Sequence, residues 1–396
     1  MQTVIRFFLG TYGEKVRERL LLIYAKILIV VFVGGAFEDE ALARQRRSKG
    51  KTSSSRVVKK SNKDSDLLEK IPKECPSWKE CWEQSVWRFL RKHSPSYGVF
   101  VAMEPATGEI LALVEYSKAR TQRGEIAQSA MFPAASIFKI VSTAALLSTG
   151  KARTGTIVCY HGGSSWIYSD NIIDTPKRDK ACSSLAQAFA RSTNGVYAKL
   201  AAKHLNADEM MDFAHLFGFN RTVKVEWLVT RSFALKPSDK LGLARMAAGF
   251  TNTRMSPLHG AVIAAVIANK GRLPDKVEFE GEEKEGERRV LDEHVAEEIA
   301  SLMKLAATAG TGRRYFAGFR SGGGVAVKSG TLTSRDGSKL FNTWMVGFFP
   351  ADKPEIAFSA LLSTGRGDLG GIKAGHLAKF ALESYQRVKK VTLSDR

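Results

Sequence analysis

The first long apolar stretch of the chain runs from Leu20 to Phe37 and is interrupted only by Lys26. A helix needs about 20 apolar residues to cross a bilayer, so these 18 residues predict a transmembrane anchor or a signal segment. Arg17 and Arg19 precede the stretch and three acidic residues, 38–40, follow it. This charge pattern favours residues 1–19 as a cytoplasmic tail, with the remainder exported as the extracytoplasmic part of a single-pass inner-membrane protein.

Two features of the next segment leave alternatives open. Ala41-Leu42-Ala43 resembles a signal-peptidase site, so a cleaved signal is the alternative to an anchor. Eight basic residues between positions 44 and 60 favour the opposite orientation by simple counting. Residues 38–71 as a whole are rich in Ser, Lys and Arg and show no hydrophobic periodicity, which predicts a basic flexible linker.

Residues 72–396 carry the patterns of a folded domain. Apolar residues at helical spacing predict an amphipathic helix over residues 77–93, a second helix over 134–147 and a last one over 373–388. Most of the middle, up to about residue 310, is Ala-rich and predicted to be helical. Runs typical of strands lie at both ends of this domain, at Tyr97–Met103, Glu109–Tyr116, Gly324–Thr331, Asn342–Phe349 and Glu355–Ser363. Strands at both ends of the domain indicate an α+β fold in which the first hairpin returns to pair with the last three strands.

Composition narrows the class of protein. The chain has 396 residues, of which 44% are apolar and 25% charged, which excludes wholesale disorder. Its net charge of +20 favours anionic surroundings, such as nucleic acid, acidic lipid or an acidic polymer, without choosing among them. The sequence contains no nucleic-acid-binding motif, so we expect no nucleic-acid partner.

The cysteines and histidines give weaker indications. The four cysteines have no zinc-finger spacing, and the seven histidines no metal-ligand spacing, so neither a metal nor a cofactor is expected. An exported chain favours disulfides. Four cysteines allow three pairings, and we favour Cys159–Cys182 with Cys75–Cys81 because both loops are then local.

The first motif that carries chemistry is Ser136-Ile137-Phe138-Lys139, which follows Pro133 at the start of a predicted helix. Residues three apart share a helix face, so the Lys139 amine is within reach of the Ser136 hydroxyl. A buried lysine loses proton affinity and can act as a general base. Three other S-x-x-K matches start at Ser48, Ser148 and Ser301, but none has this Pro-to-apolar-helix setting.

The second motif is Ser192-Thr193-Asn194, between two helix-like segments. A hydroxyl and an amide two residues apart can relay a proton and hold a substrate carbonyl. A purely structural interpretation of Ser192 is that it is a helix N-cap. Ser169-Asp170-Asn171 is a competing match, which we rank below Ser192 because it lies among turn and β-branched residues.

The third motif, Lys328-Ser329-Gly330-Thr331, ends a predicted strand and is the only K-[ST]-G in the chain. Lys328 supplies a positive charge for a carboxylate, and Gly330 lets a substrate backbone lie against the strand. Each motif alone has a structural explanation. The occurrence of all three motifs in this order along one chain is much less likely by chance than any one motif alone.

In this order the three motifs resemble those of the transpeptidase domains of penicillin-binding proteins. The resemblance covers about residues 95–390 and includes four further segments: Phe100–Ala112 (FVAMEPATGEILA), Met255–Arg272 (MSPLHGAVIAAVIANKGR), Gly310–Arg313 (GTGR) and Trp344–Pro350 (WMVGFFP). It implies a β-lactamase/transpeptidase-like fold, with a mostly antiparallel five-stranded sheet flanked by helices and an all-helical subdomain.

The resemblance also implies roles for the residues of the motifs. Ser136 would attack the carbonyl of a D-Ala-D-Ala stem peptide, and Lys139 would take its proton. Ser192 and Asn194 would relay the proton and orient the substrate, while Lys328 would tune the local field. Ser329, Gly330 and Thr331 would bind the terminal carboxylate, and the backbone N–H groups of Ser136 and Thr331 would form the oxyanion hole.

The resemblance predicts a serine D,D-transpeptidase that crosslinks peptidoglycan and is trapped by β-lactams, with other cell-wall synthesis proteins as candidate partners. Before the domain we expect neither a glycosyltransferase domain nor the pedestal of class B enzymes, because the preceding segment is short. One alternative is a D,D-carboxypeptidase or β-lactamase; the nearest match to the deacylating motif of class A β-lactamases, Glu226-Trp227-Leu228-Val229, lacks its Asn. The other alternative is a non-catalytic module that binds β-lactams or cell wall.

Overall fold

The computed structural model describes residues 64, 66–68, 76–119, 121–281, 288–319, 323–368 and 371–394. The expected tail, the segment from Leu20 to Phe37 and most of the expected linker lie outside these residues. Within the described part of the chain no helix is both long and apolar enough to span a membrane. Residues 66–68 are helical and Leu68 is buried, so ordered packing begins before residue 72, where we expected it to start.

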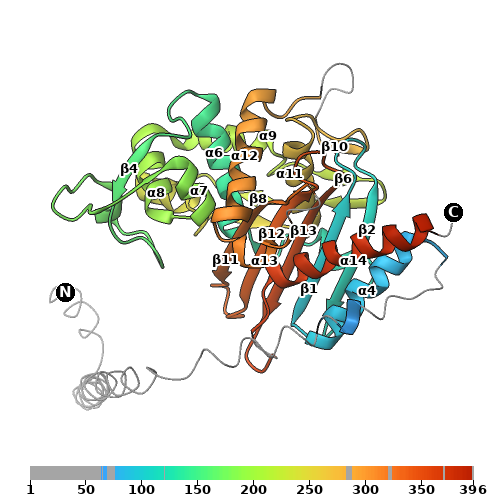
Figure 1. The fold of residues 1–396 in the computed structure, drawn as a ribbon. Helices are drawn as coiled ribbons and strands as arrows, with labels where there is room; N and C mark the ends of the chain where they lie inside the picture. The colour runs from blue at the N-terminus through green and yellow to red at the C-terminus, as the bar shows by residue number, and fades with distance from the viewer. Residues whose placement is uncertain are drawn as a thin grey trace, which may run out of the picture. The chain divides into compact units, whose positions relative to one another are not determined.

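The core of the fold is a five-stranded antiparallel sheet (Figure 1). Its strands lie in the order β11-β12-β13-β1-β2. They are β1 (Tyr97–Met103), β2 (Ile110–Ser117), β11 (Ala326–Thr333), β12 (Phe341–Phe349) and β13 (Ile356–Thr364). Strand β1 pairs with β13 from Tyr97–Ser363 to Met103–Ala357, so the predicted return of the first hairpin to the last strands is confirmed.

Two helices from opposite ends of the domain pack together on one face of this sheet (Figure 1). They are α4 (Trp78–His93) and α14 (Ala374–Ser394), which agree with the predicted first and last helices. The Trp82 indole is fully buried and its Nε1 donates to the Ala381 carbonyl at 2.8 Å. Because α4 begins with a Ser77 cap and ends in a run of basic residues, its start and end are both encoded locally.

Helices α11 and α12 contact the sheet as well, α11 along β13, β1 and β12 and α12 along β11. Helix α11 is buried from Pro257 to Ile267, as its all-round apolar sequence requires. The helices beyond α4 and α14 are α5 (Glu125–Gln128), α6 (Lys139–Ser148), α7 (Leu185–Arg191), α8 (Asn194–His204), α9 (Ala207–Leu216), α10 (Lys240–Ala247), α11 (Pro257–Ala268), α12 (Glu293–Ala309) and α13 (Arg313–Phe316), with 3₁₀ turns η2 (Ala135–Phe138) and η3 (Ser169–Ile172).

The expectation of an all-helical subdomain is wrong in detail, because short strands run through the helical region. They form sheets in the orders β4-β5, β10-β6-β7 and β3-β9-β8. Their bounds are β3 (Phe132–Pro133), β4 (Ile157–Tyr160), β5 (Ala181–Ser184), β6 (Val223–Val225), β7 (Leu228–Thr230), β8 (Phe233–Ala234), β9 (Thr253–Met255) and β10 (Val277–Phe279). Strands of two to four residues are too short to leave a period-two pattern in the sequence.

Candidate active site

The candidate nucleophile lies where turn η2 runs into helix α6. Ala135 has φ 50°, and this left-handed residue turns the chain so that Ser136 opens into a cavity. Two glycines allow the turn to pack closely. A Cβ on Gly249 would lie 2.1 Å from the Ala135 carbonyl oxygen, and one on Gly330 would lie 3.3 Å from the Ser136 nitrogen. Both glycines therefore fix the position of Ser136 through close backbone approach.

Lys139 begins α6 and is completely buried. Its Nζ lies 2.8 Å from Ser136 Oγ, 3.3 Å from Ser192 Oγ and 2.6 Å from Asn194 Oδ1. None of these partners carries a negative charge. Burial, followed by the nearby charge of Lys328, therefore lowers the pKa of Lys139 well below its ordinary value. A neutral amine beside a serine hydroxyl is the arrangement that general-base catalysis needs.

Ser192 and Asn194 reach this lysine from the junction between α7 and α8. Ser192 caps the C-terminus of α7 with φ 57°. It is therefore a C-cap, and not the N-cap that a purely structural interpretation of the sequence predicts. Asn194 begins α8, and its amide is held at both ends: Oδ1 accepts from Lys139 Nζ, while Nδ2 donates to the Ser164 carbonyl at 3.0 Å. The amide is thereby fixed in one orientation.

Lys328 reaches Ser192 from strand β11. It is completely buried, and its Nζ donates to Ser192 Oγ at 3.0 Å and to the Ser329 carbonyl at 2.8 Å. Burial lowers the pKa of Lys328 to about 7. Ser192 Oγ is thus within hydrogen-bonding distance of two buried amines, so its hydroxyl can relay a proton.

The rest of the third motif continues along strand β11. Ser329 Oγ donates to Thr311 Oγ1 at 2.6 Å, and Thr311 N in turn donates to the Ala190 carbonyl at 3.0 Å. This contact links β11 to the C-terminal end of α7, which carries Ser192. Thr331 lines the cavity on the same strand.

The cavity has a volume of about 350 Å³ and lies between β11, η2 and the segment before η3. Eleven residues line it: Ser136, Ser164, Ser165, Asn194, Ala248, Gly249, Phe250, Thr331, Leu332, Thr333 and Phe341. The lining includes hydroxyl and amide side chains and two aromatic rings. Such a cavity suits a peptide-like ligand with a reactive carbonyl at Ser136.

The structure brings together the five residues expected to do chemistry, Ser136, Lys139, Ser192, Asn194 and Lys328, from three distant segments. The competing match, Ser169-Asp170-Asn171, forms turn η3 away from this cluster; Asn171 Oδ1 accepts from Tyr168 N and its Nδ2 donates to the His161 carbonyl. Sequence reasoning missed Ser164, which acts through its carbonyl, and the contact of Thr311 with Ser329. Only Thr311 had a signal, since it stands in the glycine segment that resembles the family.

The cysteines and potential metal ligands complete the description. A disulfide joins Cys159 and Cys182 across strands β4 and β5. Cys75 lies outside the described residues, so the Cys75–Cys81 pairing stays a prediction. In the described ranges no three His, Cys, Asp or Glu side chains come together as a metal site.

Comparison with known proteins identifies the family. Residues 98–383, which are most of the chain, match the model of the penicillin binding protein transpeptidase domain. The chain belongs to this family of serine transpeptidases, and the resemblance inferred from the three motifs is confirmed.

Three similar proteins illustrate the relationship. The peptidoglycan D,D-transpeptidase PbpA of Mycobacterium tuberculosis H37Rv is 25% identical over 352 residues, covering 76% of this chain and 70% of the relative. The ceftriaxone acyl-enzyme complex of penicillin-binding protein A from M. tuberculosis matches with a TM-score of 0.59 at 24% identity, covering 78% of this chain and 77% of the other. The transpeptidase domain of Burkholderia pseudomallei penicillin-binding protein 3 matches with a TM-score of 0.63 at 19% identity, covering 83% of this chain and 95% of the other. These structural matches establish the shared fold.

Proposed function

We propose that this protein is a peptidoglycan D,D-transpeptidase that uses Ser136 as its nucleophile. The observation that carries the proposal is the position of Lys139, fully buried with its Nζ 2.8 Å from the Ser136 hydroxyl. Family membership and the curated relatives named D,D-transpeptidase support the same reaction. The substrate is a stem peptide that ends in D-Ala-D-Ala.

In the first half of the reaction, neutral Lys139 takes the Ser136 proton as the oxygen attacks the carbonyl of the penultimate D-Ala. A C–O bond forms and the carbonyl oxygen becomes an oxyanion. Collapse of this intermediate breaks the C–N bond. The proton then passes through Ser192 to the leaving amine, so that D-Ala departs and an ester on Ser136 remains.

An oxyanion hole and a carboxylate-binding group complete the site in this proposal. The backbone N–H groups of Ser136 and Thr331 receive the oxyanion, each contributing about 3–4 kcal/mol to transition-state stabilisation, as in comparable sites. The side chains of Ser329 and Thr331 bind the terminal carboxylate, with Gly330 leaving room for the substrate backbone. Lys328, when protonated, adds the positive charge that this carboxylate requires.

In the second half, an amine of another stem peptide attacks the ester and receives the acyl group, which crosslinks the two strands. A β-lactam mimics the D-Ala-D-Ala unit and leaves a stable acyl-enzyme on Ser136. The ceftriaxone acyl-enzyme of the M. tuberculosis relative supports this expectation.

For the cellular location, we propose a single-pass membrane protein with residues 20–37 as the anchor and residues 72–396 on the extracytoplasmic side. The Cys159–Cys182 disulfide supports an oxidising compartment for the domain. Comparing the mass of the protein isolated from cells with that of the full chain tests this proposal: a chain that begins after residue 43 would identify a cleaved signal instead.

Incubation with a fluorescent penicillin, followed by a denaturing gel, tests the catalytic proposal. We expect a covalent band in the wild type and in Ser301→Ala, which removes the serine of another S-x-x-K match, but none in Ser136→Ala. Incubation with a disaccharide-pentapeptide and mass analysis then separate crosslinked dimers from the tetrapeptide that a carboxypeptidase would release. Equal labelling of Ser136→Ala would refute the assignment of the nucleophile.

A further inference from the structure

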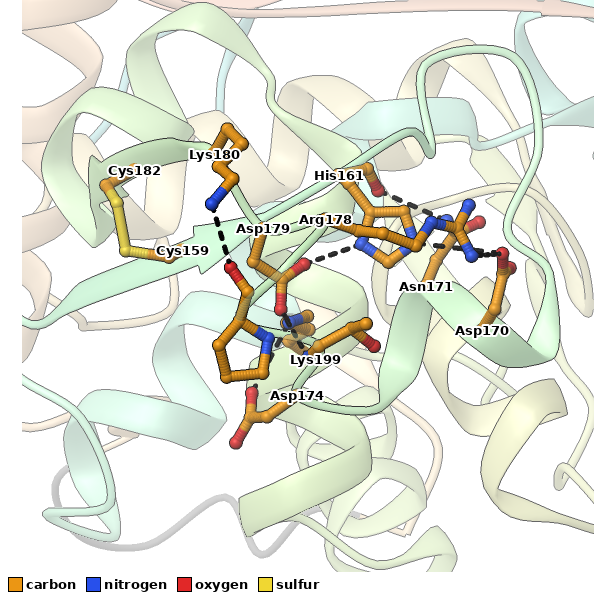
Figure 2. Close-up of polar contacts among 12 residues, drawn as sticks. Cys159, His161, Asp170, Asn171, Asp174, Arg178, Asp179, Lys180, Cys182 and Lys199 are labelled. Carbon is orange, nitrogen blue, oxygen red and sulfur yellow. Dashed lines mark hydrogen bonds and ion pairs between the residues drawn. A yellow bond between two sulfur atoms is a disulfide. The ribbon is translucent and has the colours of Figure 1, made fainter.

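Three lysines are buried in the described part of the chain, and only one of them has carboxylate partners. Lys199 on α8 forms ion pairs with Asp179 at 2.5 Å and with Asp174 at 3.3 Å, as Figure 2 shows. The other two are the active-site lysines. The pKa of Lys139 is lowered by burial and by the charge of Lys328, and that of Lys328 is lowered to about 7 by burial alone. No described carboxylate therefore acts as a counter-ion for either of them.

An aromatic ring lies beside Lys139. The Lys139 Nζ lies over the Tyr197 ring, 5.4 Å from its centre, and this ring is fully buried on α8. Burial raises the pKa of the Tyr197 phenol, so the ring stays neutral and offers only the negative potential of its face. A cation within about 6 Å of such a face is attracted to it, most strongly where water is excluded.

Hydrogen bonds fix the position of the Tyr197 ring relative to the lysine. Thr143 Oγ1 donates to the Lys139 carbonyl at 2.6 Å and lies 2.7 Å from Tyr197 Oη. Because the Thr143 hydroxyl has a single proton and uses it in the first bond, the Tyr197 hydroxyl must donate in the second. Tyr197 is thereby tied to the turn of α6 that carries Lys139.

A second ring lies beside the other active-site lysine. The Lys328 Nζ lies over the Phe189 ring, 5.6 Å from its centre, and this ring is fully buried on α7. Ser192 N donates to the Phe189 carbonyl at 3.2 Å, so the ring belongs to the helix end that presents Ser192. Phe189 stands three residues before Ser192, and Tyr197 stands three residues after Asn194. Two aromatic residues therefore flank the second motif in the sequence.

The remaining contacts of the two amines are uncharged. They are the hydroxyls of Ser136 and Ser192, the carbonyls of Ser192 and Ser329 and the amide oxygen of Asn194. We propose that Tyr197 and Phe189 are positioning residues whose rings stabilise the ammonium forms of Lys139 and Lys328 in place of counter-ions.

A ring suits this task better than a carboxylate. Lys139 becomes an ammonium when it takes the Ser136 proton, and it must be neutral again before the next cycle. A carboxylate would favour the charged lysine by about 1–3 pKa units, whereas the attraction of a ring is weaker and leaves the proton mobile. This inference rests on the proposed function and adds two residues that act through its lysines.

Each ring should control one limb of the pH dependence of acylation. In the proposed mechanism Lys139 must be neutral and Lys328 protonated, so Lys139 sets the acid limb and Lys328 the alkaline limb. Tyr197→Leu should move the acid limb to lower pH by about one unit, because the ammonium form of Lys139 loses its stabilising ring. Phe189→Leu should move the alkaline limb to lower pH by a similar amount. The rate of labelling by a fluorescent penicillin at each pH shows both limbs.

The two variants are matched controls for each other, since both remove a buried ring from the same pair of helices. A shift of one limb in each variant supports the proposal. If each variant moves both limbs equally, the effect comes from packing and the proposal fails. Limbs that stay in place in both variants would overturn it as well.

Milder changes separate the ring from its hydrogen bond and its volume. Tyr197→Phe keeps the ring and should leave the acid limb in place; a shift as large as that of Tyr197→Leu would assign the effect to the hydroxyl and contradict the proposal. Pentafluorophenylalanine in place of Phe189 keeps the shape of the ring but removes the negative potential of its face. It should move the alkaline limb as Phe189→Leu does, and an unmoved limb would refute the role of this ring.

Carbon-13 NMR of protein labelled at the lysine Cε reads the two protonation equilibria without any reaction. The signals of Lys139 and Lys328 are assigned by their absence in Lys139→Arg and Lys328→Met. If penicillin does not label the folded wild type, the proposed function fails, and these two signals alone then decide the inference. If the wild type is labelled but neither ring variant shifts the titration of its lysine, only the inference about the rings fails.

Discussion

Lys139 and Lys328 both contact the hydroxyl of Ser192, with their Nζ atoms 3.3 Å and 3.0 Å from its Oγ. Both lysines are fully buried, so two positive charges in this space would repel strongly. Burial and the charge of Lys328 lower the pKa of Lys139, while burial alone lowers that of Lys328 to about 7. In the proposed mechanism Lys139 is therefore the neutral base and Lys328 the proton carrier.

This division predicts a bell-shaped dependence of acylation on pH. The rate should rise from acid pH as Lys139 loses its proton, and fall above about pH 7 as Lys328 loses its own. The second-order rate of labelling by a fluorescent penicillin, measured from about pH 5 to about pH 10, checks this. A rate that keeps rising to the alkaline end would mean that the base is an ordinary, unshifted lysine.

Lys139→Arg should lower acylation by about 10²–10⁴-fold, because arginine stays protonated and cannot accept a proton. Lys199→Arg is the matched control, since Lys199 is also buried but pairs with carboxylates that arginine can bind equally well. We expect its labelling rate to stay close to that of the wild type. Comparable losses in both variants would mean that the substitution acts through the fold and not through the base.

Lys328→Met should stabilise the protein while it removes activity. A charged lysine in the folded state is penalised by burial, whereas in the unfolded state its pKa is the ordinary 10.5. The penalty is therefore complete below about pH 7 and disappears as the pH rises towards 10.5. We expect a gain in the free energy of unfolding on the order of 5 kcal/mol at acid pH, which is the free energy that corresponds to this pKa difference. Urea denaturation at several pH values measures it, and a gain that does not shrink with pH would contradict this account.

Gly249→Ala should damage both stability and acylation. Gly249 has φ +84°, and an added Cβ would meet the Ala135 backbone oxygen at 2.1 Å, beside the nucleophile. We expect a loss of about 3 kcal/mol in stability and at least about tenfold in labelling rate. Gly150→Ala is the control: Gly150 has φ +66° and no neighbour within 4 Å of the added atom, so only the strain of about 1–2 kcal/mol applies. Equal labelling by both variants would argue against steric control of Ser136.

The long strands were predictable because they lie in the core. Strand β1 has the predicted bounds, and the other four strands of the main sheet begin within two residues of the predicted positions. Nearly every residue of β12 and β13 is buried, so their sequences are predominantly apolar. The short strands β4 and β5 are largely exposed, and their pairing depends on the Cys159–Cys182 disulfide and on neighbouring helices. A local sequence pattern does not contain this information about distant contacts.

The site was predictable where its chemistry needs particular side chains at fixed spacing. Ser136 and Lys139 lie one helical turn apart, which the sequence states directly. The contact of Asn194 with Ser164 spans 30 residues and uses a backbone carbonyl, which any residue type supplies. The contact of Ser329 with Thr311 joins two hydroxyls that are common everywhere. Supporting contacts of this kind emerge only when the chain is folded.

Asn194→Asp should move the acid limb of the acylation profile to higher pH. The Asn194 oxygen lies 2.6 Å from Lys139 Nζ, so a carboxylate there would favour the charged lysine and raise its pKa by about 1–3 units. Labelling should then fall at neutral pH and recover partly in alkali. Asn194→Ala, which adds no charge, should label slowly without this shift. Asn206→Asp adds the same charge at the N-cap of α9, where aspartate caps as well as asparagine, and should leave the profile unchanged. An unshifted profile for Asn194→Asp would remove Lys139 from its role as the base.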